Sequence, residues 1–388
     1  MTTERPTIVF FRTAYETLGG GSQMLLRLLS GLDTSEFRLI LLTQKRDEAA
    51  ERAEKRGAEV HIAPYRGKLN TYNEELLCAS VATQLRAGLR LVQFNAETRT
   101  VLSQADVLWV DEIRSYLTVL PYILFSRTPV IWNIGLLKRS EGIMKYFHDI
   151  ALRTTSYVFI ESQSQAKRLF TDEQFETYND KFVMFHKGVD TERFAPPASR
   201  TESNPVRIGT AALIHPRKGL EDLIKAVHVL EETDVELHIA GEPGREANEE
   251  YFNRLKSLVD DYDLNSAVVF HGWVDDMPAF YTGLDIFVLP SYNEGIPGSV
   301  REAMAMELPI VATDVGGTAD VVVDDETGFL VDPGDVYSLS SCLEYLINNP
   351  GRRREMGAAG RAQIKAEFSL DAYVEKYANF LTSITESG

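Results

Sequence analysis

Two glutamates, Glu294 and Glu302, stand eight positions apart in the segment PSYNEGIPGSVREAMAMELPIVATDVGG, residues 290–317. The residue types predict a strand over DIFVLPS, a loop over NEGIPGS and a helix over VREAMAME that Pro309 limits. Glu294 would therefore lie at the carboxyl end of a strand, and Glu302 about one turn inside the following helix.

This arrangement suits a phosphorylated sugar. The free N–H groups and the dipole at the helix N-terminus, near 297–299, favour an anion. A carboxylate at Glu302 can accept hydrogen bonds from a vicinal diol such as a ribose. The segment could thus hold a sugar, a phosphate and a ribose along one line. The alternative is that the two glutamates are a capping and a surface residue of an ordinary strand–helix unit.

A second candidate is the glycine-rich stretch Leu18 to Ser22, which contains Gly20 and Gly21 and follows the strand expected over Thr7–Arg12. A glycine-rich turn that opens a helix lets the backbone approach a phosphate closely. The spacing is not GxGxxG, which disfavours a nicotinamide oxidoreductase.

Composition narrows the class of protein. A chain of 388 residues suggests two or three domains. The net charge of −17 argues against nucleic acid as a partner, because phosphate backbones need a basic face. The cysteines, Cys78 and Cys342, are expected to be free thiols in a reducing cytoplasm. We expect no signal peptide and no spanning helix, since the apolar run from Ser115 to Ser126 is too short.

Short apolar runs alternate with helical patterns along most of the chain, which predicts an α/β fold with parallel sheets. The polar, proline-containing segment 186–207 interrupts the alternation and is expected to be a linker. Two α/β units of similar size predict a ligand cleft between them, at the carboxyl ends of their strands.

Five segments resemble those of a known family; in chain order they are GVDTERFAP, HGWVDDMPAFYTGLDIFVLPS, LPSYNEG, EAMAMELPIVATDVGG and TGFLVDPGD. They are similar to the retaining nucleotide-sugar glycosyltransferases of group 1 (glycosyltransferase family 4). The resemblance is strong over residues 186–347 and weaker in the first half. It implies the GT-B fold, with two Rossmann-like domains facing each other across a cleft.

The resemblance also implies a division into three parts. Residues 1–187 would be the acceptor-binding domain and 188–368 the domain that binds the nucleotide sugar. Residues 369–388 would be a helix that packs back on the first domain. The implied reaction transfers a hexose from a UDP- or GDP-sugar to a hydroxyl of a glycan or lipid-linked glycan, with retention of configuration. It implies neither a metal nor a cofactor.

Roles for individual residues follow from the same resemblance. Glu302 would bind the ribose hydroxyls and Glu294 the donor sugar, while Lys218, in HPRKGLEDLIKA, would stabilise the departing diphosphate. The donor-binding set implied in this way is Gly20, Gly21, Arg217, Lys218, Glu242, Glu294, Gly295, Ile296, Pro297, Gly298, Ser299 and Glu302.

The chain departs from the family at three positions. An arginine usual five positions before the lysine is replaced by Leu213, and Arg217 is a candidate substitute. Histidines usual after two strands of the first domain are also absent. Asp111 and Glu112 follow one of these strands, which makes Asp111 a candidate for the catalytic position, and Asn133 follows the other. His148 is interpreted as a packing residue.

Two alternatives stay open at this point. One is a nucleotide-sugar epimerase or hydrolase on the same fold. The other is an inactive subunit that binds sugar nucleotides, which the missing histidines and Leu213 favour and the intact glutamate pair opposes.

Residues 113–170 are basic within an acidic chain. They hold eight basic and three acidic residues, a net charge of +5, interleaved with aromatic residues. A cationic, partly apolar surface suits an anionic membrane or a lipid phosphate. We therefore expect a cytoplasmic protein that could contact the inner face of the cell membrane; the alternative is scattered surface charge over buried aromatics.

Overall fold

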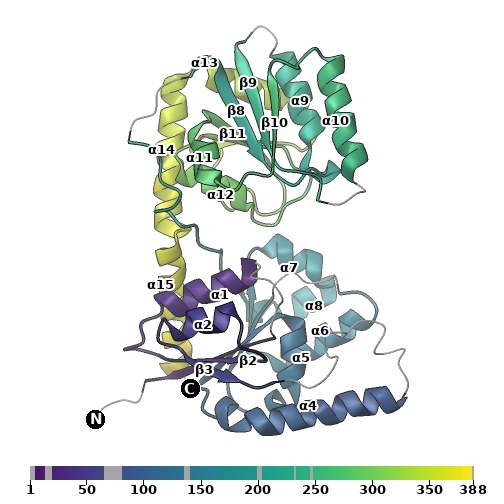
Figure 1. The fold of residues 1–388 in the computed structure, drawn as a ribbon, viewed down its shortest axis with the longest axis vertical. Coiled ribbons are helices and arrows are strands. Elements are labelled where there is room, and N and C mark those ends of the chain that lie inside the picture. Colours follow the sequence, from purple (N-terminus) through teal and green to yellow (C-terminus); the bar gives the residue numbers. More distant parts are fainter. Residues whose placement is uncertain are drawn as a thin grey trace. The chain divides into compact units, whose positions relative to one another are not determined.

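The computed structural model describes residues 5–13, 20–64, 81–134, 140–198, 203–230, 233–244 and 248–386. It consists of two compact units (Figure 1). Unit 1 is Met1–Phe185 together with Val374–Gly388, and unit 2 is His186–Tyr373. The domains expected from the sequence have slightly different limits, at 187/188 and 368/369.

Unit 1 is built on a seven-stranded sheet of order β3-β2-β1-β4-β5-β6-β7, in which all pairs are parallel. The strands are β1 (Thr7–Arg12), β2 (Arg38–Thr43), β3 (Glu59–Ile62), β4 (Val107–Asp111), β5 (Val130–Asn133), β6 (Tyr157–Ile160) and β7 (Phe182–Met184). The helices described are α1 (Gly20–Gly31), α2 (Glu48–Glu54), α4 (Val81–Leu102), α5 (Glu112–Ile123), α6 (Ile143–Thr154), α7 (Gln163–Leu169) and α8 (Asp172–Thr177), with a 3-10 turn η1 (Asn179–Lys181).

The apolar runs of the inner strands β2, β1, β4, β5 and β6 are buried on both faces, as parallel strands between helices require, whereas the edge strands β3 and β7 are only partly covered. One face packs against side chains from α4, α5, α6 and α7. His148 of α6 lies in this core, beside the rings of Trp132 and Phe170, and burial lowers its pKa to about 4. It is therefore a neutral core residue, as the sequence interpretation had it.

The last helix, α15 (Leu370–Glu386), runs into unit 1. Phe380 and Tyr377 make edge contacts with the ring of Phe159, at 5.3 Å between centroids in both cases. Phe159 alternates with Val158 and Ile160, which belong to the core on the opposite face of the sheet. The end of the chain thus covers the second face of β6.

Unit 2 has a six-stranded parallel sheet of order β10-β9-β8-β11-β12-β13. Its strands are β8 (Val206–Ala211), β9 (Val235–Ala240), β10 (Val268–Gly272), β11 (Ile286–Leu289), β12 (Ile310–Thr313) and β13 (Gly328–Val331). The helices are α9 (Leu220–Val229), α10 (Glu249–Asp261), α11 (Met277–Thr282), α12 (Gly298–Ala305), α13 (Val336–Asn348) and α14 (Pro350–Glu367), with a 3-10 turn η2 (Pro216–Lys218).

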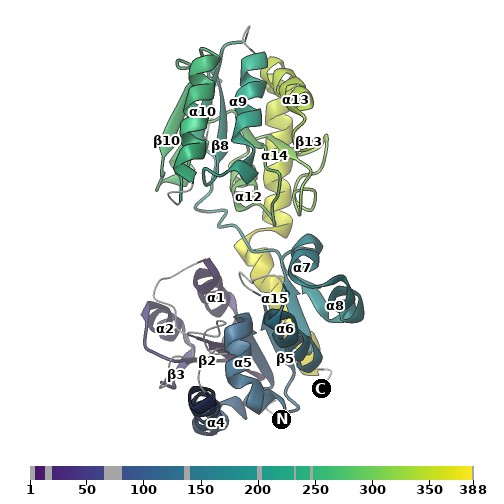
Figure 2. The ribbon, with the colours of Figure 1, turned by 90° about the vertical axis from the view of Figure 1, so that its right-hand side faces the viewer.

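Alternate residues of the inner strands β11 and β12 face two separate cores. In β11, Ile286 and Val288 join a core with α9, α10 and α13, whereas Phe287 and Leu289 join a core with α11, α12 and α14. Figure 2 shows α9 and α10 side by side on their face of the sheet. The sheet is therefore a doubly wound, Rossmann-like layer.

The structure differs from the sequence expectations at two points in unit 2. Strand β13 was not expected, because its apolar run, Phe329 to Val331, is only three residues long and is partly buried at the edge of the sheet. Helix α12 ends at Ala305 instead of Glu307, because Glu307 adopts a left-handed φ of 59°. The amides of Glu307 and Leu308 donate to the carbonyls of Met304 and Ala303, which is a Schellman end.

Candidate active site

The candidate residues of unit 2 lie where its strand order reverses. Strands β8 and β11 are neighbours in the sheet but their connections leave in opposite directions. Doubly wound sheets bind ligands at such a switch point, beside the carboxyl ends of the strands. Lys218 ends the loop after β8, and Glu294 lies in the loop after β11.

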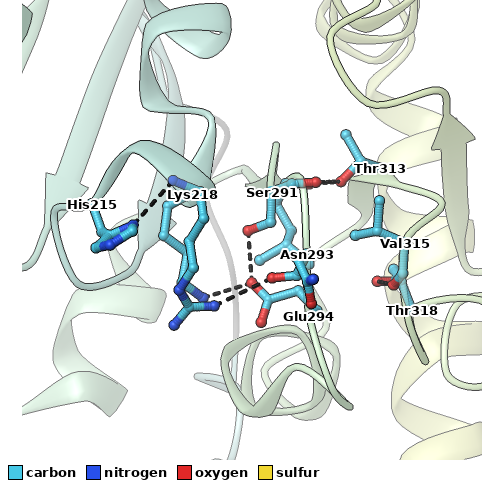
Figure 3. A network of polar contacts seen from close by, with 10 residues as sticks. His215, Lys218, Ser291, Asn293, Glu294, Thr313, Val315 and Thr318 are labelled. Carbon is cyan, nitrogen blue, oxygen red and sulfur yellow. Dashed lines mark hydrogen bonds and ion pairs between the residues drawn. The ribbon is translucent and has the colours of Figure 1, made fainter. Parts of the chain in front are cut away.

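Lys218 and Glu294 form an ion pair across this point. Lys218 Nζ donates to Glu294 Oε1 at 2.6 Å, with side-chain exposures of 13% and 8% (Figure 3). The fully buried Ser291 donates to the same oxygen at 2.6 Å, and Thr313 Oγ1 donates to the carbonyl oxygen of Ser291 at 2.5 Å. A buried charge needs both a partner and further hydrogen bonds, and this network supplies them.

Two glycines allow the loops to approach each other. Gly219 has a φ of 64°, and a Cβ there would overlap the carbonyl oxygen of Pro290. Gly316 has a φ of 62°, and a Cβ there would overlap the carbonyl oxygen of Glu294. The Gly317 amide also donates to the carbonyl oxygen of Gly295 at 2.8 Å. The backbone around Glu294 is therefore held from both sides.

Arg217 reaches the same loop as Lys218. Its Nη1 donates to the carbonyl oxygen of Asn293 at 3.3 Å, and its carbonyl accepts from the Tyr292 amide at 2.8 Å. The tight 3-10 turn Pro216–Lys218 therefore brings both cations to residues 293–294. Leu213 is 44% exposed, and a Cβ at Gly244 would come within 2.7 Å of its Cδ1.

Helix α12 begins as the sequence predicts, with Pro297 as its N-cap and Gly298 as its first residue. Ile296 and Pro297 are buried, Gly298 is exposed, and Gly295 and Ser299 are half-buried. The amides of the first turn of a helix have no intrahelical acceptor, so this end favours an anion. Gly295 to Ser299 thus lie between the buried Glu294 and the body of the helix.

Glu302 lies further along α12 and is half-buried. Its Oε2 accepts a hydrogen bond from the hydroxyl of Tyr281 at 3.0 Å. Burial and the charge of Glu302 raise the pKa of Tyr281 well above its usual value, so the phenol keeps its proton.

Glu242 lies just after the neighbouring strand β9. Its side chain is exposed, and its carbonyl oxygen accepts from the Ile214 amide at 3.1 Å.

The candidates of unit 1 lie at the corresponding point of its own sheet, where β1 and β4 are neighbours. Asp111 is the last residue of β4; it is 3% exposed and its Oδ1 accepts from Asn133 Nδ2 at 2.8 Å. Gly20 and Gly21 form the first turn of α1. The other residues of the glycine-rich stretch before Gly20 fall outside the described part of the chain.

Sequence reasoning missed three residues of this site. Ser291 stands in the quoted segment, three positions before Glu294, and its hydroxyl was the available signal. Thr313 bonds to Ser291 because strand β12 lies beside β11, and Tyr281 bonds to Glu302 because their helices pack together. The sequence carries no local signal for either contact. Among the described residues, no group of three or more His, Cys, Asp or Glu side chains could hold a metal ion.

Residues 192–363 match the protein family described as "Glycosyl transferases group 1". The capsular polysaccharide biosynthesis glycosyltransferase CapM of Staphylococcus aureus is 25% identical over 329 residues, 73% of this chain and 84% of the relative. A GDP-mannose-dependent monoacylated alpha-(1-6)-phosphatidylinositol monomannoside mannosyltransferase of Corynebacterium glutamicum is 34% identical over 222 residues, 52% of this chain. The match covers 56% of that relative, so the chain spans about half its length.

Solved structures share the fold over nearly the whole chain. A glycosyltransferase of Rickettsia africae superposes with a TM-score of 0.75 at 19% identity, covering 99% of this chain and 100% of that one. HepE of Anabaena, solved in complex with UDP, superposes with a TM-score of 0.73 at 16% identity, covering 97% of this chain and 100% of that one. At such identities the likeness establishes the architecture.

Proposed function

We propose that this chain is a group 1 glycosyltransferase that transfers a hexose from a nucleotide diphosphate sugar to a hydroxyl acceptor, since residues 192–363 match that family and the chain has the GT-B fold of solved glycosyltransferases. The observation that carries the proposal is the ion pair of Lys218 with Glu294, held by Ser291 where the strand order of unit 2 reverses. A cation, a carboxylate and a helix N-terminus meet there, which matches a sugar joined to a diphosphate.

The proposed chemistry follows from the charge that develops during transfer. When the bond between the sugar and the diphosphate breaks, negative charge grows on the phosphate oxygens. Lys218 and the first amides of α12 are the groups that would stabilise this charge, with Arg217 beside them. Glu294 would accept hydrogen bonds from the sugar hydroxyls, and Glu302 from the ribose. Because these groups are fixed before the substrate arrives, little reorganisation is needed.

Retention of configuration and independence from a metal are part of the proposal. A leaving phosphate oxygen can take the acceptor proton on the same face of the sugar, so an enzymic histidine is not required. Asp111 is proposed to orient the acceptor hydroxyl from unit 1, because its buried carboxylate ends a strand at the switch point of that sheet. Relatives named for mannosyl transfer from GDP-mannose to phosphatidylinositol mannosides support a glycan or lipid-linked acceptor.

A panel of nucleoside diphosphates tests the donor class. We expect either UDP or GDP, with its sugar conjugates, to raise the unfolding temperature, because a ligand at a hundred times its Kd stabilises by about 3 kcal/mol. The other base and the adenine nucleotides should shift the temperature much less. Thermal unfolding at graded ligand concentrations measures this. If no nucleoside diphosphate shifts the transition, the proposed donor site is wrong.

We also propose that residues 113–170 contact an anionic membrane surface. Tyr116 and Trp132 of this segment are core residues, so they cannot contribute to such a surface. Phe125 is 92% exposed and stands two positions before the exposed Arg127, a pairing that suits a lipid headgroup region. Within the described residues, no helix is both long and apolar enough to cross a bilayer.

Vesicle flotation tests this contact. The protein is expected to float with vesicles that contain anionic lipid and not with neutral ones, and Phe125→Glu should reduce the bound fraction several-fold. Val229→Glu is the matched control, because Val229 is a 59% exposed apolar residue of unit 2. Flotation that is independent of anionic lipid would remove the proposal.

A further inference from the structure

Tyr281 is buried completely, yet it carries a polar group that meets the candidate site. Its hydroxyl donates to Glu302 Oε2 at 3.0 Å and lies 3.4 Å from the carbonyl oxygen of Ser299. Tyr281 belongs to α11, whereas Ser299 and Glu302 belong to α12. The bond therefore joins two helices that are separated in sequence by strand β11.

The ring of Tyr281 has little freedom to move. It makes contacts with the rings of Phe280, Phe287 and Phe194, at 5.8, 5.6 and 6.1 Å between centroids. These rings come from α11, from β11 and from the segment before β8, so the tyrosine is held on several sides. A close-packed aromatic side chain in this position places its hydroxyl at one point in space.

The side chain of Glu302, by contrast with the ring of Tyr281, is long and has several rotatable bonds. It is half-buried on α12, and a glutamate side chain has three rotatable bonds, so its carboxylate could adopt several positions. A hydrogen bond from a fixed donor selects one of them. Hydrogen bonds to an ionised acceptor are stronger than those between neutral groups.

We propose that Tyr281 is a positioning residue that fixes the carboxylate of Glu302 for the hydroxyls of the donor ribose. The inference rests on the proposed function, since it takes the ribose as the ligand of Glu302. The phenol remains a donor at neutral pH, because burial and the nearby carboxylate raise its pKa. Tyr281 does not touch the reacting atoms, so its effect should fall on donor affinity and little on kcat.

The test measures how proteins with and without the Tyr281 hydroxyl bind the ribonucleotide and its 2′,3′-dideoxy form. Calorimetry would measure the affinity of the wild-type protein and of Tyr281→Phe for UDP and GDP, and for their 2′,3′-dideoxy forms. The phenylalanine keeps the ring contacts and removes only the hydroxyl. We expect Tyr281→Phe to bind the ribonucleotide about tenfold more weakly, whereas its affinity for the dideoxy nucleotide changes less than twofold.

A Glu302→Gln background and a Tyr116→Phe control show whether the effect of Tyr281→Phe depends on Glu302. In a Glu302→Gln background the added Tyr281→Phe change should have less than a twofold effect on ribonucleotide affinity, because the charge-assisted bond is already lost. Tyr116→Phe is the control, because Tyr116 is also fully buried and hydrogen-bonded, to Thr154 Oγ1 at 2.9 Å, but lies in unit 1. It should leave nucleotide affinity unchanged.

Failure of the Tyr281 inference and failure of the proposed ribose role of Glu302 would give different results. Equal losses for the ribonucleotide and the dideoxy nucleotide in Tyr281→Phe would show a merely structural role and overturn the inference alone. Equal affinities of the wild-type protein for both nucleotides would overturn the ribose role of Glu302, and the inference with it. A wild-type preference for ribose that survives intact in Tyr281→Phe would also overturn the inference.

Discussion

Replacing Lys218 by methionine is expected to lower the rate of sugar transfer by a factor of about 100 to 1,000. That is the usual effect of removing one group that stabilises developing negative charge. Lys218 is 13% exposed and ends the 3-10 turn η2 that precedes α9, with its ammonium group 2.6 Å from Glu294. Methionine keeps the length and much of the packing of the side chain while removing the charge.

A loss of stability must be separated from this loss of rate. Lys218→Met leaves the carboxylate of Glu294, which is 8% exposed, without its cation, and such a change costs roughly 3 kcal/mol. The double variant Lys218→Met/Glu294→Gln removes both charges and should recover most of the stability, because Ser291 can still donate to the glutamine. Its transfer rate should remain at least as low as that of the single variant.

Transfer assays and thermal unfolding of the same preparations measure the two effects. Lys225→Met is the matched control, because Lys225 is 40% exposed and pairs with Asp222 at a looser 3.6 Å. It should change neither rate nor stability appreciably. Transfer by the double variant at a third or more of the wild-type rate would contradict the proposed site. Products formed without an acceptor would instead indicate a hydrolase or an epimerase.

Gly219→Ala is expected to destabilise unit 2 by about 4 kcal/mol or to prevent its folding. Two costs combine at this position. The left-handed φ of 64° costs an alanine about 1 kcal/mol, and the new Cβ would overlap the carbonyl oxygen of Pro290. The backbone of either loop must then move, and Lys218 would move with it.

The structure offers a control that separates these two costs. Gly272 has nearly the same φ, 67°, but a Cβ there would meet no heavy atom within 4 Å. Gly272→Ala should therefore cost only about 1 kcal/mol. Denaturant unfolding of both variants gives the comparison. Similar losses in the two would show that the loops after β8 and β11 are not packed as closely as described.

The local character of the elements could be predicted from the sequence. Apolar runs such as Thr7–Arg12 bury both faces of a strand, and helix-forming residues between a proline and a left-handed turn make α12. These signals are local, because strand and helix preferences depend on near neighbours in the chain. The short edge strand β13, whose apolar run is only three residues long, was missed.

The sequence likewise predicted one part of the candidate site and missed another. The positions of Glu294 and Glu302 relative to a strand end and a helix start follow from residue types over about a dozen positions. Their partners do not, because Lys218 is 76 residues from Glu294 and Tyr281 is 21 residues from Glu302. A hydrogen bond between distant residues depends on strand order and helix packing, which the local pattern does not encode.

The succession of a carboxylate, a helix N-terminus and a glycine pair along one strand–helix unit is encoded locally, in the residue types of a single segment. The position of β8 beside β11, by which Lys218 neutralises Glu294 and Gly219 meets Pro290, is a property of the folded chain. Local conformational preference acts within a few residues, whereas ion pairs and close packing act between any surfaces that the fold brings together.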